Sequence, residues 1–280
     1  MKNSIWMTLG LVTSLALPAC GDDGDSDDGS TTATETGDTT TTDSGDGDGD
    51  GDGDGDGDGD GETTGDGDGD GDGAMLRVLH LGVDAPAVDI YLNDGAEPAV
   101  AALAFQSGTP YVTVPAGTYS VDIVAAGGDP ASPVATFETP ALADGVMYTA
   151  AAHDYLANLG LLALVDNTEG IASGNIRLQV VHAAPDVGQV DIWEISDGSN
   201  PALLFEDVDY GAGGMLDVPA GALEIGLDLD NDATPDVTFS VPDLGGDKQV
   251  NVFAVNEAGG SPAFLLAQLP DGSTARVDAN

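Results

Sequence analysis

The best local motif for metal binding is the segment Asp228-Leu229-Asp230-Asn231-Asp232-Ala233-Thr234-Pro235-Asp236. Carboxylates fall at positions one, three, five and nine of this acidic loop, and Thr234 can offer its backbone carbonyl at position seven. Calcium prefers six to eight hard oxygen ligands, so the spacing predicts a calcium site formed by Asp228, Asp230, Asp232, Thr234 and Asp236. Ala233 stands where such loops usually have a glycine. The alternative is an acidic hairpin loop without an ion, because Asp and Asn are common in turns.

The histidines are the next candidates for chemistry. His80 and His182 occupy equivalent places in two similar segments, and a pair of histidines invites a zinc or catalytic interpretation. No cysteine or acidic residue at ligand spacing completes a zinc site, so we predict structural histidines that hydrogen-bond the turn after each strand. His153 is expected in a loop. The sequence has no Gly-x-Ser-x-Gly elbow and no His-Glu-x-x-His motif, so a hydrolytic enzyme remains only an alternative.

Cys20 is the single cysteine, and no intramolecular disulfide is therefore possible. It follows a charged start at Lys2, an apolar run and the small residue Ala19, which predicts a signal peptide over residues 1–19. The pattern resembles a bacterial lipobox. That resemblance implies cleavage before Cys20, acylation of Cys20, and a place in the bacterial cell envelope. Gly21 resembles the signal for delivery to the outer membrane, on its periplasmic face or at the cell surface.

Residues 20–73 read as a lipidated cysteine followed by a tether of Gly, Asp, Thr and Ser. Such a segment has too little apolar surface to offset its chain entropy, which predicts disorder. Its alternating carboxylates repel one another and extend the chain. The whole protein has a formal net charge of −45, which argues against nucleic acid as a partner. The partners we expect are the membrane, reached through the lipid, and a cell-surface protein or glycan.

The elements that must position these residues form an internal repeat. Arg77-Val78-Leu79-His80 recurs as Gln179-Val180-Val181-His182, and Val114-Pro115-Ala116-Gly117 recurs as Val218-Pro219-Ala220-Gly221. The boundaries that this offset predicts are residues 74–172 and 173–280. The repeated positions that we interpret as structural are His80, Asp89, Pro115, Gly117, His182, Asp191, Pro219 and Gly221.

Each copy shows short alternating runs separated by turn residues, which is typical of an all-β sandwich. Tyr119, Val121 and Ile123 alternate on one face of a predicted strand, and residues 156–165 are apolar enough for a buried strand. No helix is predicted. The sequence therefore favours an all-β protein with two tandem immunoglobulin-like β-sandwich domains after a disordered tether.

The set His-x-x-x-Asp-Ala-Pro-Ala-Val-Asp-Ile-Tyr, from His80 to Tyr91, precedes Val-Pro-Ala-Gly-Thr-Tyr and a terminal Leu-Leu-Ala-Leu-Val-Asp-Asn. Together these motifs resemble the exported domain-of-unknown-function family 4397. The resemblance implies an immunoglobulin-like fold, often in tandem copies, and no established activity. We therefore expect a lipid-anchored, non-enzymatic module for binding or adhesion. A calcium-stabilised structural spacer is the alternative from another class.

Overall fold

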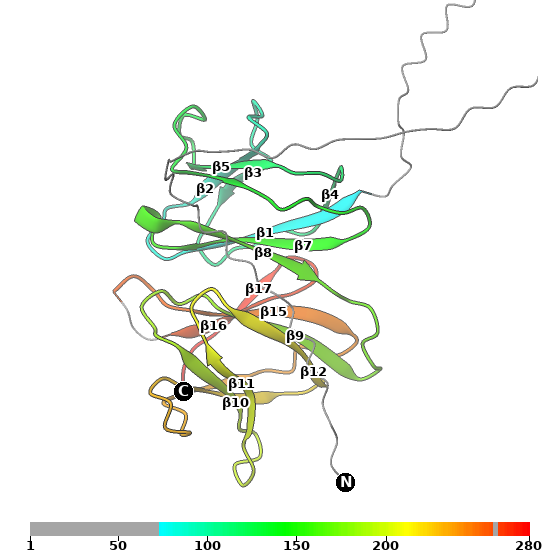
Figure 1. Cartoon of the computed structure of the whole chain (residues 1–280), viewed down its shortest axis with the longest axis vertical. Coiled ribbons are helices and arrows are strands. Elements are labelled where there is room, and N and C mark those ends of the chain that lie inside the picture. The colour runs from blue at the N-terminus through cyan, green and yellow to red at the C-terminus, as the bar shows by residue number, and fades with distance from the viewer. Residues whose placement is uncertain (1–72, 260–262) are drawn as a thin grey trace, which may run out of the picture. The chain divides into compact units, whose positions relative to one another are not determined.

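The computed structural model describes residues 73–259 and 263–280. These residues form an all-β protein with four sheets arranged as two β-sandwiches, which confirms the predicted fold class (Figure 1). The one helical element among them is a single 3₁₀ turn, η1 (Leu156–Asn158). No helix in the described part of the chain has the length and apolar character needed to cross a membrane. The predicted signal peptide, Cys20 and almost all of the predicted tether lie outside the described residues.

The first sandwich contains an inner sheet with the strand order β4-β1-β7-β8 and an outer sheet with the order β3-β2-β5-β6. Their strands are β1 (Ala74–Gly82), β2 (Val88–Leu92), β3 (Val100–Leu103), β4 (Val112–Val114), β5 (Ser120–Ala125), β6 (Ala135–Glu138), β7 (Met147–Asp154) and β8 (Gly160–Asp166).

The second sandwich contains an inner sheet with the order β12-β9-β15-β16-β17 and an outer sheet with the order β11-β10-β13-β14. Their strands are β9 (Asn175–His182), β10 (Val190–Glu194), β11 (Ala202–Val208), β12 (Gly213–Pro219), β13 (Leu223–Asp228), β14 (Val237–Val241), β15 (Lys248–Val255), β16 (Phe264–Gln268) and β17 (Thr274–Val277).

The two sandwiches have the same strand order, apart from the additional β17. In each inner sheet the first strand pairs in parallel with the seventh. β1 pairs with β7 from Met75↔Met147 onward, and β9 pairs with β15 from Ile176↔Lys248 onward. All other strand pairs are antiparallel. Similar sequence segments therefore occupy equivalent strands of the two sandwiches.

A continuous apolar cluster joins the two inner sheets, and we call this contact the seam. Every buried member of the cluster is at most 1% exposed. The members are Leu79, Leu81, Ala151, Leu162, Leu164, Val181, Ala183, Phe253, Val255, Phe264 and Leu266. Each inner sheet also packs on its own outer sheet through separate clusters. Both faces of β1 are thus buried, which explains why it is apolar at most positions on both faces. The seam face of β9 is more polar, because Arg177 and Gln179 lie on the same face as Val181.

The repeated aspartates hold a β-bulge in each outer sheet. Asp89 accepts hydrogen bonds from the amides of Ala102 at 2.7 Å and Gly127 at 2.8 Å. In the second sandwich, Asp191 accepts from the amide of Asp207 at 2.7 Å. Ala102 and Asp207 have φ angles of 52° and 55°, and the strand register shifts beside both aspartates. A buried carboxylate that satisfies a bulge amide offsets part of the cost of positive φ at a residue other than glycine.

The repeated Val-Pro-Ala-Gly segments lie at the ends of β4 and β12. Gly117 and Gly221 have φ angles of 147° and 153°, a region in which a side chain is strained. Tyr119 donates its hydroxyl to the carbonyl of Pro115 at 2.6 Å, which fixes the corner after β4. The positive φ accounts for a glycine at both positions.

Two expectations for the first sandwich were wrong. His153 is not in a loop but near the end of β7. Residues 156–165 are not a single buried strand, because residues 156–158 form η1 and β8 lies at the outer edge of its sheet. Val165 of β8 is 52% exposed. An apolar run of this length does not distinguish a central strand from an edge strand, because the run reports the composition of the strand and not its position in the sheet.

Candidate functional site

The acidic loop of residues 228–236 connects β13 to β14, which are paired from Leu223↔Val241 to Leu227↔Val237. Asp228, Asp230 and Asp236 each offer a carboxylate oxygen to a group whose atoms lie within 4.8 Å of one another. Asp232 belongs to the same loop but not to this group. The hairpin therefore brings together three of the four carboxylates that the spacing suggested.

Asp228 organises the loop from within. Its side chain accepts hydrogen bonds from four loop amides, at 3.3 Å from Asp230, 2.8 Å from Asn231, 3.3 Å from Asp232 and 2.7 Å from Ala233. Burial acts to raise the pKa of Asp228, but these amides outweigh it and hold the pKa below its usual value. Asp228 is therefore a negative centre already well supplied with donors, which leaves it a poorer ligand than an open carboxylate.

Asp230 is the loop carboxylate whose ionisation is opposed by its acidic neighbours. The charge of Asp232, followed by that of Asp236, raises the pKa of Asp230 above its usual value. Like charges at this spacing disfavour ionisation, and a bound cation would remove that penalty. Asp236 also accepts the amide of Leu229 at 2.7 Å with one oxygen, so its second oxygen can still act as a ligand.

Two residues of the loop other than glycine have positive φ, Asn231 at 58° and Ala233 at 65°. Asparagine tolerates this conformation, whereas alanine is strained by about 1 kcal/mol or more. Ala233 is the position at which calcium loops usually have glycine. The loop therefore turns through positive φ at these two residues, and it is held by its own hydrogen bonds to Asp228.

His80 and His182 bond the turns that follow their strands. The Nε2 of His80 lies 3.1 Å from the carbonyl oxygen of Pro86, and that of His182 lies 2.8 Å from the carbonyl oxygen of Gly188. The Nδ1 of each ring accepts a backbone amide two residues later, from Gly82 at 3.1 Å and Ala184 at 3.4 Å. Burial lowers the pKa of both rings, so both are neutral at pH 7. Both nitrogens of each ring are occupied by backbone groups.

His153 is half-buried, and its Nδ1 lies 2.6 Å from the hydroxyl oxygen of Tyr210 in the second sandwich. Tyr210 also packs edge-on against the His182 ring, with the ring centroids 5.9 Å apart. Burial lowers the pKa of His153. Within residues 73–259 and 263–280, no histidine ring hydrogen-bonds a carboxylate or a serine hydroxyl. His153 therefore contributes to the seam.

A buried polar network at the seam was not anticipated from the sequence. The carboxylate of Asp166 accepts hydrogen bonds from Gln249 and Asn251 of the second sandwich, both at 2.9 Å, and from Thr149 and Tyr111 of the first. The Arg77 guanidinium lies 3.4 Å from the same carboxylate, and both side chains are 1% exposed. We call this set the Asp166 network.

The buried guanidinium of Arg77 makes hydrogen bonds and a cation–π contact in addition to its ion pair with Asp166. It donates to Thr149 at 2.7 Å and to the carbonyl of Leu269 in the second sandwich at 2.8 Å, and it lies 4.6 Å from the centroid of the Tyr111 ring. Burial raises the pKa of Tyr111, which therefore remains a hydrogen-bond donor. One feature of the sequence could have indicated this network, since a charged residue stands in each of two apolar strands. These residues are Arg77 in β1 and Asp166 at the end of β8. Their pairing could not be inferred, because 89 positions separate them.

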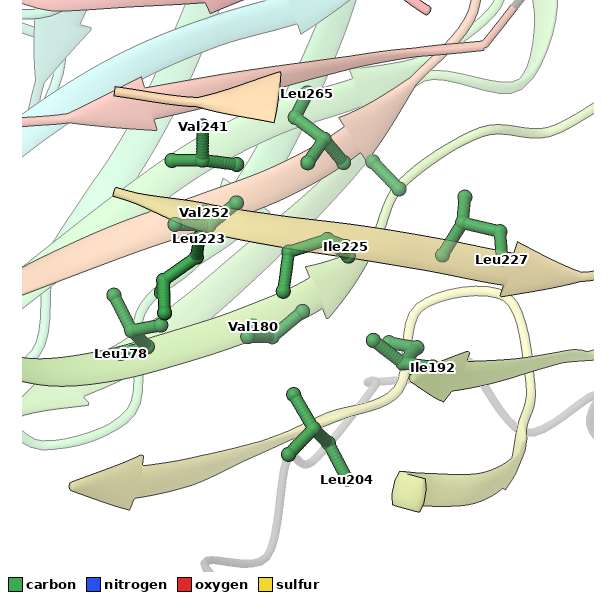
Figure 2. Close-up of a pocket in the computed structure, with 11 residues that line it drawn as sticks. Leu178, Val180, Ile192, Leu204, Leu223, Ile225, Leu227, Val241, Val252 and Leu265 are labelled. Carbon is green, nitrogen blue, oxygen red and sulfur yellow. The ribbon is translucent and has the colours of Figure 1, made fainter. Parts of the chain in front are cut away.

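The second sandwich contains an apolar cavity of about 30 Å³ between its two sheets (Figure 2). Its lining is entirely aliphatic and comprises Leu178, Val180, Ile192, Leu204, Leu223, Ile225, Leu227, Val241, Val252, Ala254 and Leu265. Ligand pockets usually measure about 300 to 1,000 Å³ and contain a few polar groups. This cavity is therefore a packing defect and not a ligand site.

Comparison with known proteins gives a family match and distant structural similarity. A family profile described as a domain of unknown function (DUF4397) matches residues 74–193. No curated protein matches the chain.

Among solved structures, one described as alpha-glucan binding by a streptococcal virulence factor is 15% identical. The similarity covers 67% of this chain and 95% of that one, with a TM-score of 0.23. A second, on alpha-glucan recognition by family 41 carbohydrate-binding modules from streptococcal virulence factors, is 16% identical over 64% and 93% of the two chains, with a TM-score of 0.22. The Bacillus anthracis TIE protein is 8% identical over 73% and 43%, with a TM-score of 0.21. Scores this low carry no argument about ligands.

Proposed function

We propose that this protein is a lipid-anchored module of the bacterial cell envelope that presents its two sandwiches for binding or adhesion and catalyses no reaction. In this proposal Cys20 carries the lipid, residues 21–73 form the anionic tether, and residues 74–280 form the head. The anchor places the head at the outer membrane. The partner is a cell-surface protein or glycan.

The seam is the observation that carries the proposal. Eleven side chains that are at most 1% exposed, together with the Asp166 network, connect the two inner sheets. Fully burying one large aliphatic or aromatic side chain is worth about 1.5 to 3 kcal/mol, so a seam of this size favours one rigid head over two independent domains. A rigid head on a long tether presents fixed surfaces at a distance from the membrane, as a binding module requires.

The charge of the head narrows the class of partner. Residues 74–280 contain 29 acidic and four basic residues, a difference of −25. Three of the four basic residues form ion pairs, namely Arg77 with Asp166, Arg177 with Asp217, and Arg276 with Glu257 and Asp278. The surface is therefore strongly anionic, which supports a neutral or cationic partner and opposes nucleic acid.

The anchor is tested by comparing the full chain with its Cys20→Ala variant in a Gram-negative host. We expect the wild type to incorporate labelled fatty acid and fractionate with the outer membrane, whereas the variant stays unlabelled and soluble. Binding is then measured separately on immobilised envelope polysaccharide and on surface protein from the same cells. Equal membrane association of both proteins would exclude the anchor, and no retention on either material would exclude the binding role.

The acidic loop supports a second candidate, a calcium-stabilised spacer. The observation that favours it is the group formed by Asp228, Asp230 and Asp236, whose ligand atoms lie within 4.8 Å of one another. In this role calcium would hold the β13–β14 hairpin and no specific partner would be needed. A calcium-dependent rise in melting temperature without retention on envelope material would favour the spacer over the binding module.

A further inference from the structure

Before its last residue, Asp166, the outer edge of β8 lacks the features that usually protect an exposed strand. The strand is seven residues long, Gly160-Leu161-Leu162-Ala163-Leu164-Val165-Asp166, without proline or lysine. Its pairing with β7 continues from His153↔Gly160 to Met147↔Asp166 without a register shift. Among the described residues, no backbone hydrogen bond joins β8 to any segment other than β7. A regular, aliphatic edge of this kind is a ready template for another strand.

Most of the other outer strands are short, irregular or capped. β3 and β11 have register shifts, and β4 has only three residues. β12 ends at Pro219 and carries Asp217, which is paired with Arg177. The chain end covers part of β14, because the amide of Asn280 donates to the carbonyl of Thr238 at 3.0 Å. These are the usual protections of a strand edge. β8 has only one of them, the inward-pointing Asp166 at its end, which pairs with Arg77, and residues 160–165 have none.

The second sandwich shows what covers the equivalent edge. Leu161-Leu162-Ala163-Leu164 of β8 corresponds in the repeat to Leu265-Leu266-Ala267-Gln268 of β16. There β17 adds as an antiparallel fifth strand, paired from Leu265↔Val277 to Gln268↔Thr274. In the first sandwich the chain continues from β8 across the seam to β9, so that inner sheet has four strands and not five.

We propose that β8 binds an extended, basic segment of a partner polypeptide as an antiparallel fifth strand. Backbone hydrogen bonds along the edge would supply affinity, and alternate side chains would supply specificity. Val165, which is 52% exposed, offers apolar surface to such a strand. This inference rests on the proposed binding function and names the class of partner and the surface that binds it.

The charge of the head argues for a basic partner. β17 itself contains Arg276, whose guanidinium lies 3.9 Å from the centroid of the Phe264 ring and pairs with Glu257. An anionic head of this size attracts a cationic strand over a long range. A second copy of the same chain is disfavoured as the occupant, because two heads of like charge repel each other.

The test uses two matched variants of the full chain and a fluorescent peptide in which Thr-Ala-Arg-Val is flanked by lysines. Val165→Lys adds a positive charge at the β8 edge. Val112→Lys makes the same change on β4, at the opposite edge of the same sheet, where Val112 is 54% exposed. Because both side chains are exposed, both variants should fold. We expect Val165→Lys to weaken peptide binding about ten-fold or more and Val112→Lys to change it less than about two-fold.

Amide hydrogen exchange locates the binding site of the peptide on the protein. Peptide binding should slow exchange at the amides of β8 and leave those of β4 unchanged. Equal weakening by the two variants, protection elsewhere, or absence of binding would overturn the proposal. Sedimentation that shows a dimer lost only in Val165→Lys would also overturn it, in favour of a second copy. The peptide could fail to bind while the wild type and Val165→Lys still bind envelope material equally well. In that case the proposed function stands and only the β8 proposal is refuted.

Discussion

Replacing Asp166 with asparagine should strongly destabilise the protein. Asparagine keeps the size of the side chain but removes the counter-ion of Arg77, which is 1% exposed. It also puts an NH₂ group where only donors point, because Gln249 and Asn251 donate to one carboxylate oxygen and Thr149 and Tyr111 to the other. Breaking a buried ion pair by removing one partner costs about 3 to 5 kcal/mol.

Asp217→Asn is the matched control. It removes the partner of Arg177 from an ion pair whose side chains are 13% and 29% exposed. More exposed pairs of this kind contribute about 0 to 1 kcal/mol. The expected free energies of unfolding therefore differ by at least about 2 kcal/mol between the two variants, although the chemical change is the same.

The measurement is urea-induced unfolding of the purified protein, followed by far-ultraviolet circular dichroism. For a head of this size, the loss in Asp166→Asn corresponds to a fall in melting temperature of roughly 6 to 20 °C. A loss within about 1 kcal/mol of the Asp217→Asn value would refute the reasoning, since it would mean that water or rearrangement compensates Arg77. The double variant Arg77→Met with Asp166→Leu should not restore stability, because the buried hydroxyls of Thr149 and Tyr111 would lose their acceptor.

Three further predictions concern the acidic loop, the cavity and the histidines. Calcium at about 10 mM should raise the melting temperature by roughly 3 to 10 °C, and the double variant Asp230→Asn with Asp236→Asn should abolish the rise. A wild-type melting temperature that does not change with calcium would exclude the site. Val252→Ile should fill the cavity and stabilise the protein by about 0.7 kcal/mol, which is the cavity volume of about 30 Å³ multiplied by about 24 cal/mol per Å³. The stability is measured by urea unfolding, and a lower stability of the variant would show that the cavity cannot accept a methylene. Burial lowers the pKa of His153, so the unfolded chain binds protons below about pH 6.5 that the folded protein does not, and the free energy of unfolding should fall as the pH drops from 7.5 to 5.5. His153→Gln should reduce that fall, and an identical pH profile in the variant would contradict the assignment.

Local patterns were sufficient for the fold class and for many strands. Tyr119, Val121 and Ile123 alternate in sequence, and all three are buried. The Val-Pro-Ala-Gly segments place strand ends correctly because proline and glycine restrict the backbone irrespective of distant contacts. The acidic loop was also recognisable, since its ligand atoms come from nine consecutive residues.

Local patterns were not sufficient where burial depends on a distant segment. β8 has the composition of a buried strand, yet Val165 is exposed because its sheet ends there. His153 lies between Ala152 and Asp154 in the sequence, but β7 places it against Tyr210 of the second sandwich. In both cases the deciding neighbour is far away in the chain.

The all-β fold, the repeated turns and the acidic loop could be predicted from local sequence, because these features depend on residues within about ten positions of one another. The folded protein was needed to show that the inner sheets share the seam, that Arg77 meets Asp166 there, and that β8 is an open edge whereas β16 is covered by β17. Each of these features depends on contacts between strands distant in sequence. Periodicity reports which face of a strand is apolar, but it does not identify what that face or edge will meet.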